Sequence, residues 1–194
     1  KKEKPVYVFH FAAHIEARES VENPVFDAKI NILGSLNILG NCRKFGVKKI
    51  IFASSGGEIY GEAKEIPTSE TYLPHPLSPY GVGKLAVEKY LDSYCRLFGI
   101  SYLALRFGNV YGPRQNPRGE AGVVAIFADK MLKNEQPFIH GDGKQTKDYI
   151  FIDDAIEASF RAFKNNFEGI INIGTGKETN VLDIFQKIKE LTKS

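Results

Sequence analysis

The chain has 194 residues, of which 43% are hydrophobic and 25% are charged, a balance typical of a folded globular protein and not of a disordered one. Its net charge of +3 comes from 26 basic and 23 acidic side chains spread along the sequence. No run of like charge is longer than pairs such as Lys1-Lys2 and Lys48-Lys49, so we expect no nucleic-acid partner. The apolar stretches are far shorter than a membrane span, so we also expect no membrane partner.

The two cysteines indicate a reducing, cytoplasmic setting. Cys42 and Cys95 lie in amphipathic segments and lack the spacing of a metal-binding or redox pair. We therefore expect reduced thiols in a cytoplasmic protein, with neither a disulfide framework nor a metal site built on cysteine.

Three strands and two helices are predicted for the first part of the chain. The apolar run 6–11 is rich in β-branched and aromatic residues, which predicts a strand buried on both faces. A long apolar pattern predicts a helix over 24–45, and the run 48–53 predicts a second buried strand. A second helix is predicted over 80–98 and a third buried strand over 102–107.

This alternation of strands and helices predicts an α/β fold in which helices cover a doubly wound parallel sheet. In open sheets of this kind, ligands bind beyond the carboxyl ends of the strands. The segments expected at that edge are 11–14, 54–58 and 108–111, and small or polar residues occur in each of them. The candidate chemistry is therefore expected in these three segments.

The remaining part of the chain is less regular. Helices are predicted over 122–132 and 181–191, and short strands over 149–152 and 170–173. Asp153 is expected to cap a further helix, and it is better explained in this way than as part of a paired-carboxylate site.

One helix start carries a candidate catalytic pair. Ser78 before a proline is a good helix entry, and it places Tyr80 and Lys84 four residues apart on one helix face. A lysine ammonium beside a phenol lowers the phenol pKa, which would make Tyr80 a general acid or base near neutral pH. The alternative is chance, because Tyr60 and Lys64 have the same spacing, although that pair lies in a predicted loop.

The turn after the second strand supports the same interpretation. Ser54 and Ser55 stand at the expected carboxyl end of that strand, where a hydroxyl could bind a substrate oxygen beside a tyrosine. Gly56 and Gly57 follow and would allow a close approach of the backbone. Alternatively, the serines only satisfy backbone groups of the turn, which is common.

Several motifs in the right order resemble the extended short-chain dehydrogenase/reductase family. Within it the chain is most similar to NAD-dependent nucleotide-sugar epimerases of the UDP-glucose (UDP-galactose) 4-epimerase type. The resemblance runs from Val6 to Leu191 and rests on the following segments: 9–14, Asn31, 52–61, 78–84, 105–114, 119–124, 138–143, 147–149 and 153–154.

The resemblance implies a Rossmann-like nucleotide-binding domain over 1–115 and part of a smaller α/β substrate-binding domain over 116–194, with one segment returning to the first sheet. It implies that Tyr80 is the catalytic base, that Lys84 holds the nicotinamide ribose, and that Ser55 bonds the sugar 4-hydroxyl. NAD would be lined by these further residues: Phe11, Ala12, Ala13, Asn31, Ser54 and Phe107. The sugar nucleotide, a UDP-hexose, would be lined by Asn109, Val123, Val124, Phe138, Ile139, His140 and Lys147.

Lys147 stands where the family usually has an arginine that binds the diphosphate. A lysine keeps the charge but cannot form two parallel hydrogen bonds, so this contact departs from the family pattern. His10 is expected in the core and His14 beside the cofactor, and no set of companion ligands suggests a metal site.

The implied reaction is epimerisation at C4 of the sugar through a transient 4-keto intermediate. One alternative is a nucleotide-sugar 4,6-dehydratase, because Glu58 matches one member of the acidic pair that such enzymes use, whereas Gly56 and Gly57 occupy the preceding positions. Another alternative is a relative that binds nucleotide sugars without catalysis, and the intact Ser55, Tyr80 and Lys84 set argues against it.

Two expectations concern the whole protein. The helices over 24–45 and 80–98 carry apolar residues on more than one face, which predicts a homodimer that pairs these helices. No glycine-rich dinucleotide turn occurs near the start of the chain, so about two βα units, on the order of 60 residues, are expected to be missing. The 194 residues alone are therefore expected to bind NAD poorly and to be inactive.

Overall fold

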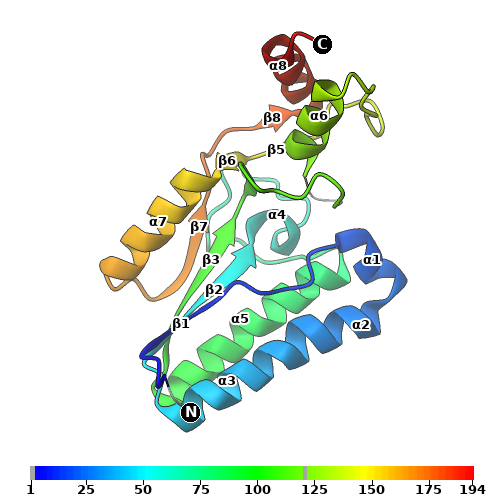
Figure 1. The fold of residues 1–194 in the computed structure, drawn as a ribbon. Helices are drawn as coiled ribbons and strands as arrows, with labels where there is room; N and C mark the ends of the chain where they lie inside the picture. The colour runs from blue at the N-terminus through cyan, green and yellow to red at the C-terminus, as the bar shows by residue number, and fades with distance from the viewer. Residues whose placement is uncertain (1–2, 120–121) are drawn as a thin grey trace.

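A computed structural model describes residues 3–119 and 122–194. Lys1, Lys2 and positions 120 and 121 of the motif at 119–124 lie outside the described residues. The main sheet has four parallel strands in the order β1-β2-β3-β7, and helices cover both of its faces (Figure 1). Its strands are β1 (Tyr7–His10), β2 (Lys49–Ser55), β3 (Ser101–Phe107) and β7 (Gly169–Ile173). The predicted α/β parallel sheet is confirmed.

The helices keep the predicted order, with two additions. Residues 24–45 form one helical stretch, as predicted, but it contains a π-helical turn that no sequence pattern indicated. A short helix also precedes this stretch, and another follows β2. The helices are α1 (Ala17–Glu22), α2 (Pro24–Ala28), η1 (Lys29–Leu33, the π turn), α3 (Gly34–Phe45), α4 (Gly56–Ile59), α5 (Pro79–Phe98), α6 (Val123–Leu132), α7 (Ile152–Lys164) and α8 (Val181–Thr192).

Two apolar cores lie on opposite faces of the sheet. On one face, α3 and α5 pack against side chains such as Ile50 and Ala104. On the other face, α7 packs against side chains such as Ile51 and Leu105 (Figure 1). Because β2 and β3 lie between these two layers, both of their faces are buried, which explains their continuous apolar runs.

The C-terminal part contains two small paired-strand units and a third core. The pair β4 (Asn109–Tyr111) and β6 (Tyr149–Phe151) is parallel, and the pair β5 (Thr146–Lys147) and β8 (Thr179–Asn180) is antiparallel. Helices α6 and α8 pack against each other through a cluster that includes Phe127 and Ile188. None of the helices in the described parts of the chain combines the length and apolarity needed to cross a membrane.

Two local predictions are wrong. Strand β1 is not buried on both faces, because it is the edge of the described sheet and its side chains Tyr7 and Phe9 are 48% and 50% exposed. Asp153 is not a helix cap, because α7 begins at Ile152 and Phe151 occupies the cap position. Asp153 instead lies in the first turn, where a carboxylate interacts favourably with the helix dipole.

Helix α5 has clear start and stop signals. The Ser78 side chain caps its first turn by accepting a hydrogen bond of 3.1 Å from the backbone N–H of Gly81. Pro79 occupies the first turn, where its missing N–H has no cost. The helix ends at Phe98, and the capping residue Gly99 has the left-handed conformation that glycine adopts without strain.

A buried ion pair attaches α5 to the sheet. Glu88 and Arg106 form two hydrogen bonds, with Arg106 Nε 2.9 Å from Glu88 Oε1 and Nη2 2.6 Å from Oε2. Both side chains are at most 2% exposed. The guanidinium of Arg106 also lies 4.8 Å from the centre of the Tyr60 ring, and hydrogen bonds to Glu88 raise the pKa of Arg106. A buried charge pair of this kind fixes the helix against β3 in one register.

We predict that Glu88→Gln lowers the free energy of unfolding by about 3 kcal/mol or more, because it leaves the Arg106 charge buried without a counter-ion. Urea-induced unfolding of the full-length protein measures this loss. The matched control is Asp92→Asn in the same helix, which breaks an exposed ion pair with Arg96 and should cost less than about 1 kcal/mol. Similar losses in the two variants would contradict the assignment.

Candidate active site

A cavity of about 650 Å³ lies at the carboxyl ends of β1, β2 and β3. All three segments expected at this edge contribute to its lining, as predicted from the order of strands and helices. Thirteen of the residues singled out from the sequence line it together: Phe11, Ala13, Ser54, Ser55, Tyr80, Lys84, Phe107, Asn109, Val123, Phe138, Ile139, His140 and Lys147.

Four residues expected beside the cofactor or the substrate do not line this cavity: Ala12, Val124, Asn31 and His14, whose contacts are given below. Ala12 is exposed beside it, and Val124 packs in the core between α6 and α8. Asn31 is buried, and its amide bonds the backbone N–H and C=O of His14 at 2.9 Å each. Asn31 therefore holds the loop after β1, which carries Ala13 to the cavity.

Tyr80 and Lys84 lie on the buried side of α5, one turn apart. The Lys84 ammonium donates a hydrogen bond of 2.7 Å to the carbonyl oxygen of Ala53 in β2. It also lies 5.5 Å from the centre of the Tyr80 ring and 4.8 Å from that of Phe52. The predicted proximity of the tyrosine and the lysine is confirmed, and the bond to Ala53 fixes where the ammonium lies.

The pKa of Tyr80 is not lowered in this structure, contrary to the expectation from the neighbouring Lys84. Burial raises the pKa of Tyr80 above its ordinary value, and the carboxylates of Glu58 and Asp27 raise it further. Burial also lowers the pKa of Lys84 to about 8, although Asp27 opposes this change. Because two carboxylates and a low-dielectric setting act on the phenol, its neutral form is favoured.

Glu58 links the short helix α4 to the start of α5. Its Oε2 accepts a hydrogen bond of 2.7 Å from the Ser78 hydroxyl, the same group that caps α5. The backbone approach is close, because a Cβ atom on Gly81 would lie 2.5 Å from the carbonyl oxygen of Glu58. Gly81 therefore allows α4 to lie against the first turn of α5, and Glu58 lines the cavity beside Tyr80.

The two serines at the end of β2 have different surroundings. The Ser54 hydroxyl donates a hydrogen bond of 2.6 Å to Glu88 Oε1, so it extends the buried ion pair to the cavity wall. Ser55 lines the cavity at the last position of β2. Gly57 leaves the wall open, since a Cβ there would meet no atom closer than 4.0 Å, whereas a Cβ on Gly56 would lie 3.4 Å from the carbonyl oxygen of Phe107.

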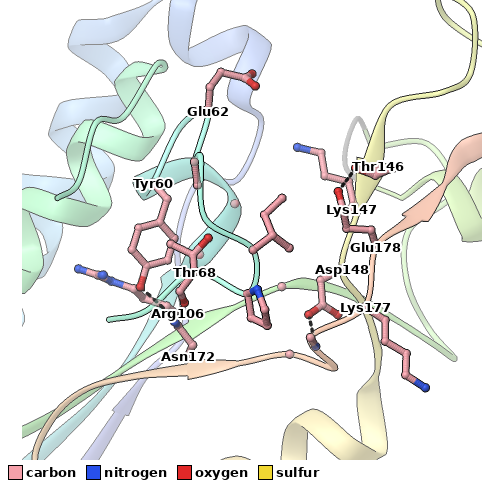
Figure 2. Close-up of a pocket in the computed structure, with 18 of the residues that line it drawn as sticks. Tyr60, Glu62, Thr68, Arg106, Thr146, Lys147, Asp148, Asn172, Lys177 and Glu178 are labelled. Carbon is pink, nitrogen blue, oxygen red and sulfur yellow. Dashed lines mark hydrogen bonds between the residues drawn. The ribbon is translucent and has the colours of Figure 1, made fainter. Parts of the chain in front are cut away.

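A second cavity of about 630 Å³ adjoins the first and shares Gly57, Gly108, Gln145 and Lys147 with it. Figure 2 shows residues of its wall, which come from the loop after α4, from β3, and from the region of β5 and β7. Asn172 accepts a hydrogen bond of 2.8 Å from the Tyr60 hydroxyl. The carboxylate of Asp148 accepts hydrogen bonds from the turn after β7.

The two histidines have structural partners. His10 Nε2 lies 2.8 Å from the Ser35 hydroxyl in the core, as expected. His14 lies between two carboxylates, with Nε2 3.1 Å from Glu19 and Nδ1 3.4 Å from Asp27, and these contacts raise its pKa. Within residues 3–119 and 122–194, no group of His, Cys, Asp and Glu side chains could hold a metal ion.

Some residues around the site were not singled out from the sequence. Glu88, Arg106 and Asp27 are buried and charged, and each lies one or two contacts from a cavity residue. The sequence contains a signal for Glu88, because it lies one turn after Lys84 on the buried face of α5, which also includes Val87 and Leu91. A charge on a buried helix face requires a partner elsewhere in the chain.

Comparisons with known proteins agree on a single family. The family model described as "NAD dependent epimerase/dehydratase family" matches residues 1–174. A Methanocaldococcus jannaschii protein, provisionally named a UDP-glucose 4-epimerase, is 53% identical over 182 residues, which are 94% of this chain and 59% of that protein. A dTDP-D-glucose 4,6-dehydratase of Dictyostelium discoideum is 30% identical over 200 residues, 97% of this chain and 45% of that protein.

Solved structures give the same result. The Thermotoga maritima UDP-glucose 4-epimerase with UDP-glucose has a TM-score of 0.93 and 49% identity, over 98% of this chain and 62% of that one. The Thermus thermophilus UDP-glucose 4-epimerase in complex with NAD has a TM-score of 0.93 and 43% identity, over 98% of this chain and 63% of that one. The chain thus spans about 60% of the length of the relatives it matches. On these matches and on its fold, the chain belongs to the NAD-dependent epimerase/dehydratase family.

Proposed function

We propose that the protein catalyses NAD-dependent 4-epimerisation of a UDP-hexose of the UDP-glucose and UDP-galactose type. The observation that carries the proposal is the meeting of Ser55, Tyr80 and Lys84 in one cavity at the carboxyl edge of the sheet. A hydroxyl, a phenol and an ammonium in such a cavity can bind and deprotonate a sugar hydroxyl. The similarity to UDP-glucose 4-epimerases of known structure supports the same reaction.

The residues on one side of the cavity suit a dinucleotide. Phe11 and Ala13 follow β1, and Phe107 ends β3, so apolar surface and exposed backbone lie beside Lys84. We assign these residues and Ser54 to NAD, with the Lys84 ammonium reaching the ribose next to the nicotinamide. NAD supplies the hydride acceptor and donor and a positively charged ring when it is bound. The neighbours Ala12 and Asn31 are assigned as support for this wall, since the amide of Asn31 holds the backbone of His14.

Tyr80 is proposed to take and return the proton of the sugar 4-hydroxyl. In the chain as described its phenol favours the neutral form, because burial raises its pKa and the carboxylates of Glu58 and Asp27 raise it further. A positive charge placed beside the ring would lower that pKa. Tyr80 would thus become an effective base only when the cavity holds a cationic group, which restricts proton removal to the loaded site.

The opposite wall suits a sugar nucleotide. It is formed by side chains from β4, from α6 and from the segment after α6: Asn109, Val123, Phe138, Ile139 and His140. Val124 supports this wall from the core. Lys147 lies at the boundary of the two cavities, exposed and free to reach a diphosphate, which it would bind as a point charge. We propose that residues 1–115 hold NAD and the catalytic groups and that 116–194 hold most of the substrate, with β7 returning to the first sheet.

Product analysis tests the proposed reaction. Full-length protein is incubated with NAD and with a panel of UDP-, dTDP- and GDP-hexoses, and UDP-glucose and UDP-galactose are expected to interconvert. Tyr80→Phe should lower kcat by about 10²-fold or more, the usual contribution of a general acid–base group. Tyr90→Phe is the matched control, because Tyr90 lies on the exposed side of the same helix.

Two other outcomes would contradict the proposed reaction. A product that has lost the sugar 6-hydroxyl would identify a 4,6-dehydratase, the alternative suggested by Glu58. That carboxylate bonds Ser78 at the start of α5, which favours a structural role over water elimination. Tight binding of UDP-sugars without turnover would instead identify a non-catalytic relative.

We also propose that the protein is a cytoplasmic homodimer. Cys42 and Cys95 are free thiols, which suits a reducing compartment. The outer faces of the helical stretch 24–45 and of α5 expose apolar side chains, among them Val25, Phe26, Ile30, Leu33, Val82 and Leu97. Exposed apolar surface on two adjacent helices is typical of an interface between protein chains.

We predict that Ile30→Glu converts the dimer to a monomer, because it places a charge in the apolar interface. Light scattering of the full-length protein at micromolar concentration measures the mass. Leu73→Glu is the control, since Leu73 is 81% exposed in the loop before α5 and should leave the mass unchanged. A monomeric wild-type protein under these conditions would refute the interface.

A further inference from the structure

A buried carboxylate lies directly behind the Tyr80 and Lys84 pair. Asp27, in α2, is 1% exposed. Its Oδ1 accepts a hydrogen bond of 2.8 Å from the Asn31 amide and lies 3.4 Å from His14 Nδ1. Burying a carboxylate is costly unless positive charges lie near it, and here these are His14 and the Lys84 ammonium.

A glycine of α5 brings this carboxylate next to the catalytic pair. A Cβ atom on Gly83 would lie 3.5 Å from Asp27 Oδ2, so Oδ2 faces the bare backbone of α5 at that position. Gly83 lies between Tyr80 and Lys84 in α5, and the Asp27 carboxylate is close enough to act electrostatically on both side chains. Asp27 makes no hydrogen bond to the Lys84 ammonium, which donates to Ala53, so its effect on Lys84 acts through space.

We propose that Asp27 is a positioning residue, whose buried carboxylate, held by Asn31 and His14, keeps Lys84 charged and fixes the protonation of Tyr80. The proposal rests on the proposed epimerase function and adds to it a source of electrostatic control. Asp27 touches neither substrate nor cofactor in this role. It acts on the two residues that do.

Charged and titratable groups on the neighbouring elements also surround Tyr80, Lys84 and Asp27. The Glu19 carboxylate of α1 is hydrogen-bonded to His14 on the side of the ring away from Asp27. Glu58 of α4 raises the pKa of Tyr80. Burial, and to a smaller extent the Lys84 charge, lower the pKa of His10 of β1, which favours its neutral form. Of the carboxylates, Asp27 is the one that acts on both Tyr80 and Lys84.

The sign of the effect follows from these charges. A negative charge favours the protonated forms of both an ammonium and a phenol, so Asp27 raises the pKa of Lys84 and that of Tyr80. Neutralising Asp27 therefore lets both groups lose their protons at lower pH. Because Tyr80 must be deprotonated and Lys84 charged for activity, both limbs of the pH–activity profile should move toward acid.

The first experiment measures kcat and kcat/KM against pH for the epimerisation of UDP-glucose by the full-length protein. Asp27→Asn keeps the size of the side chain, and we expect both limbs to shift toward acid by about one pH unit, the order expected for unit charges several Å apart. Asp92→Asn, at the far end of α5, should leave the profile in place. A general loss of activity without a shift would mean that Asp27 is only structural, and would refute the proposal.

A second variant tests the proposal even if Asp27→Asn does not fold. His14→Gln removes the cation beside Asp27 and leaves the carboxylate in place. Since the raised pKa of His14 keeps it charged in mildly acidic solution, this variant should move only the acid limb, and toward higher pH. A shift in the same direction as that of Asp27→Asn would contradict the proposal.

A measurement without turnover separates this proposal from the proposed function. NMR of protein labelled with ¹³C at lysine Cε follows the titration of Lys84, assigned by its loss in Lys84→Met. The midpoint is expected near 8 in the wild type and lower in Asp27→Asn. An unchanged midpoint would refute the role of Asp27, whereas a shifted midpoint in a protein that epimerises no hexose would refute only the reaction.

Discussion

The attachment of α5 to the sheet is the constraint on which the site depends. That helix carries Tyr80 and Lys84, while Ser55 belongs to β2, so the two parts must be held in a fixed register for their side chains to meet. The Glu88–Arg106 pair provides this register on the buried side, and the Ser54 hydroxyl joins it to the strand that ends in Ser55. Hydrophobic packing alone resists separation of the layers but opposes sliding only weakly, whereas a pair with two hydrogen bonds fixes both distance and direction.

Much of the fold follows from sequence patterns, because β2, β3 and α5 are long and strongly patterned. Runs of buried apolar residues and a capped helix start leave few other interpretations. The features that were not predicted, or were predicted wrongly, are ones that the local sequence pattern does not determine. β5 and β8 have two residues each, too few for a period of two to be detected, and they form through pairing across 32 residues of sequence. The exposure of β1 depends on its place at a sheet edge, which an apolar run cannot reveal.

The gathering of these residues around one cavity was predictable from the sequence, and the charges that act on Tyr80 were not. Residues such as Ser55, Tyr80 and Asn109 follow strand ends or open a helix, so topology alone brings them to one edge. The pKa of Tyr80 depends instead on its burial and on Glu58 and Asp27. These two carboxylates are 22 and 53 residues away in sequence, and they approach through close helix contacts at Gly81 and Gly83. A lysine one turn away is visible in the sequence, but the carboxylates that outweigh it are not.

The π turn at 29–33 determines which way the side chains of the preceding helix α2 face. A π turn holds one residue more than an α-helical turn would, and each residue of a helix turns the chain by about 100°. Loss of one residue here would restore a regular helix and rotate α2 by that angle against α3. Asp27 would then point away from Gly83, while Leu39 and Cys42 would stay in the core. A change of length in this segment would therefore alter the site, although the segment lies outside the cavity.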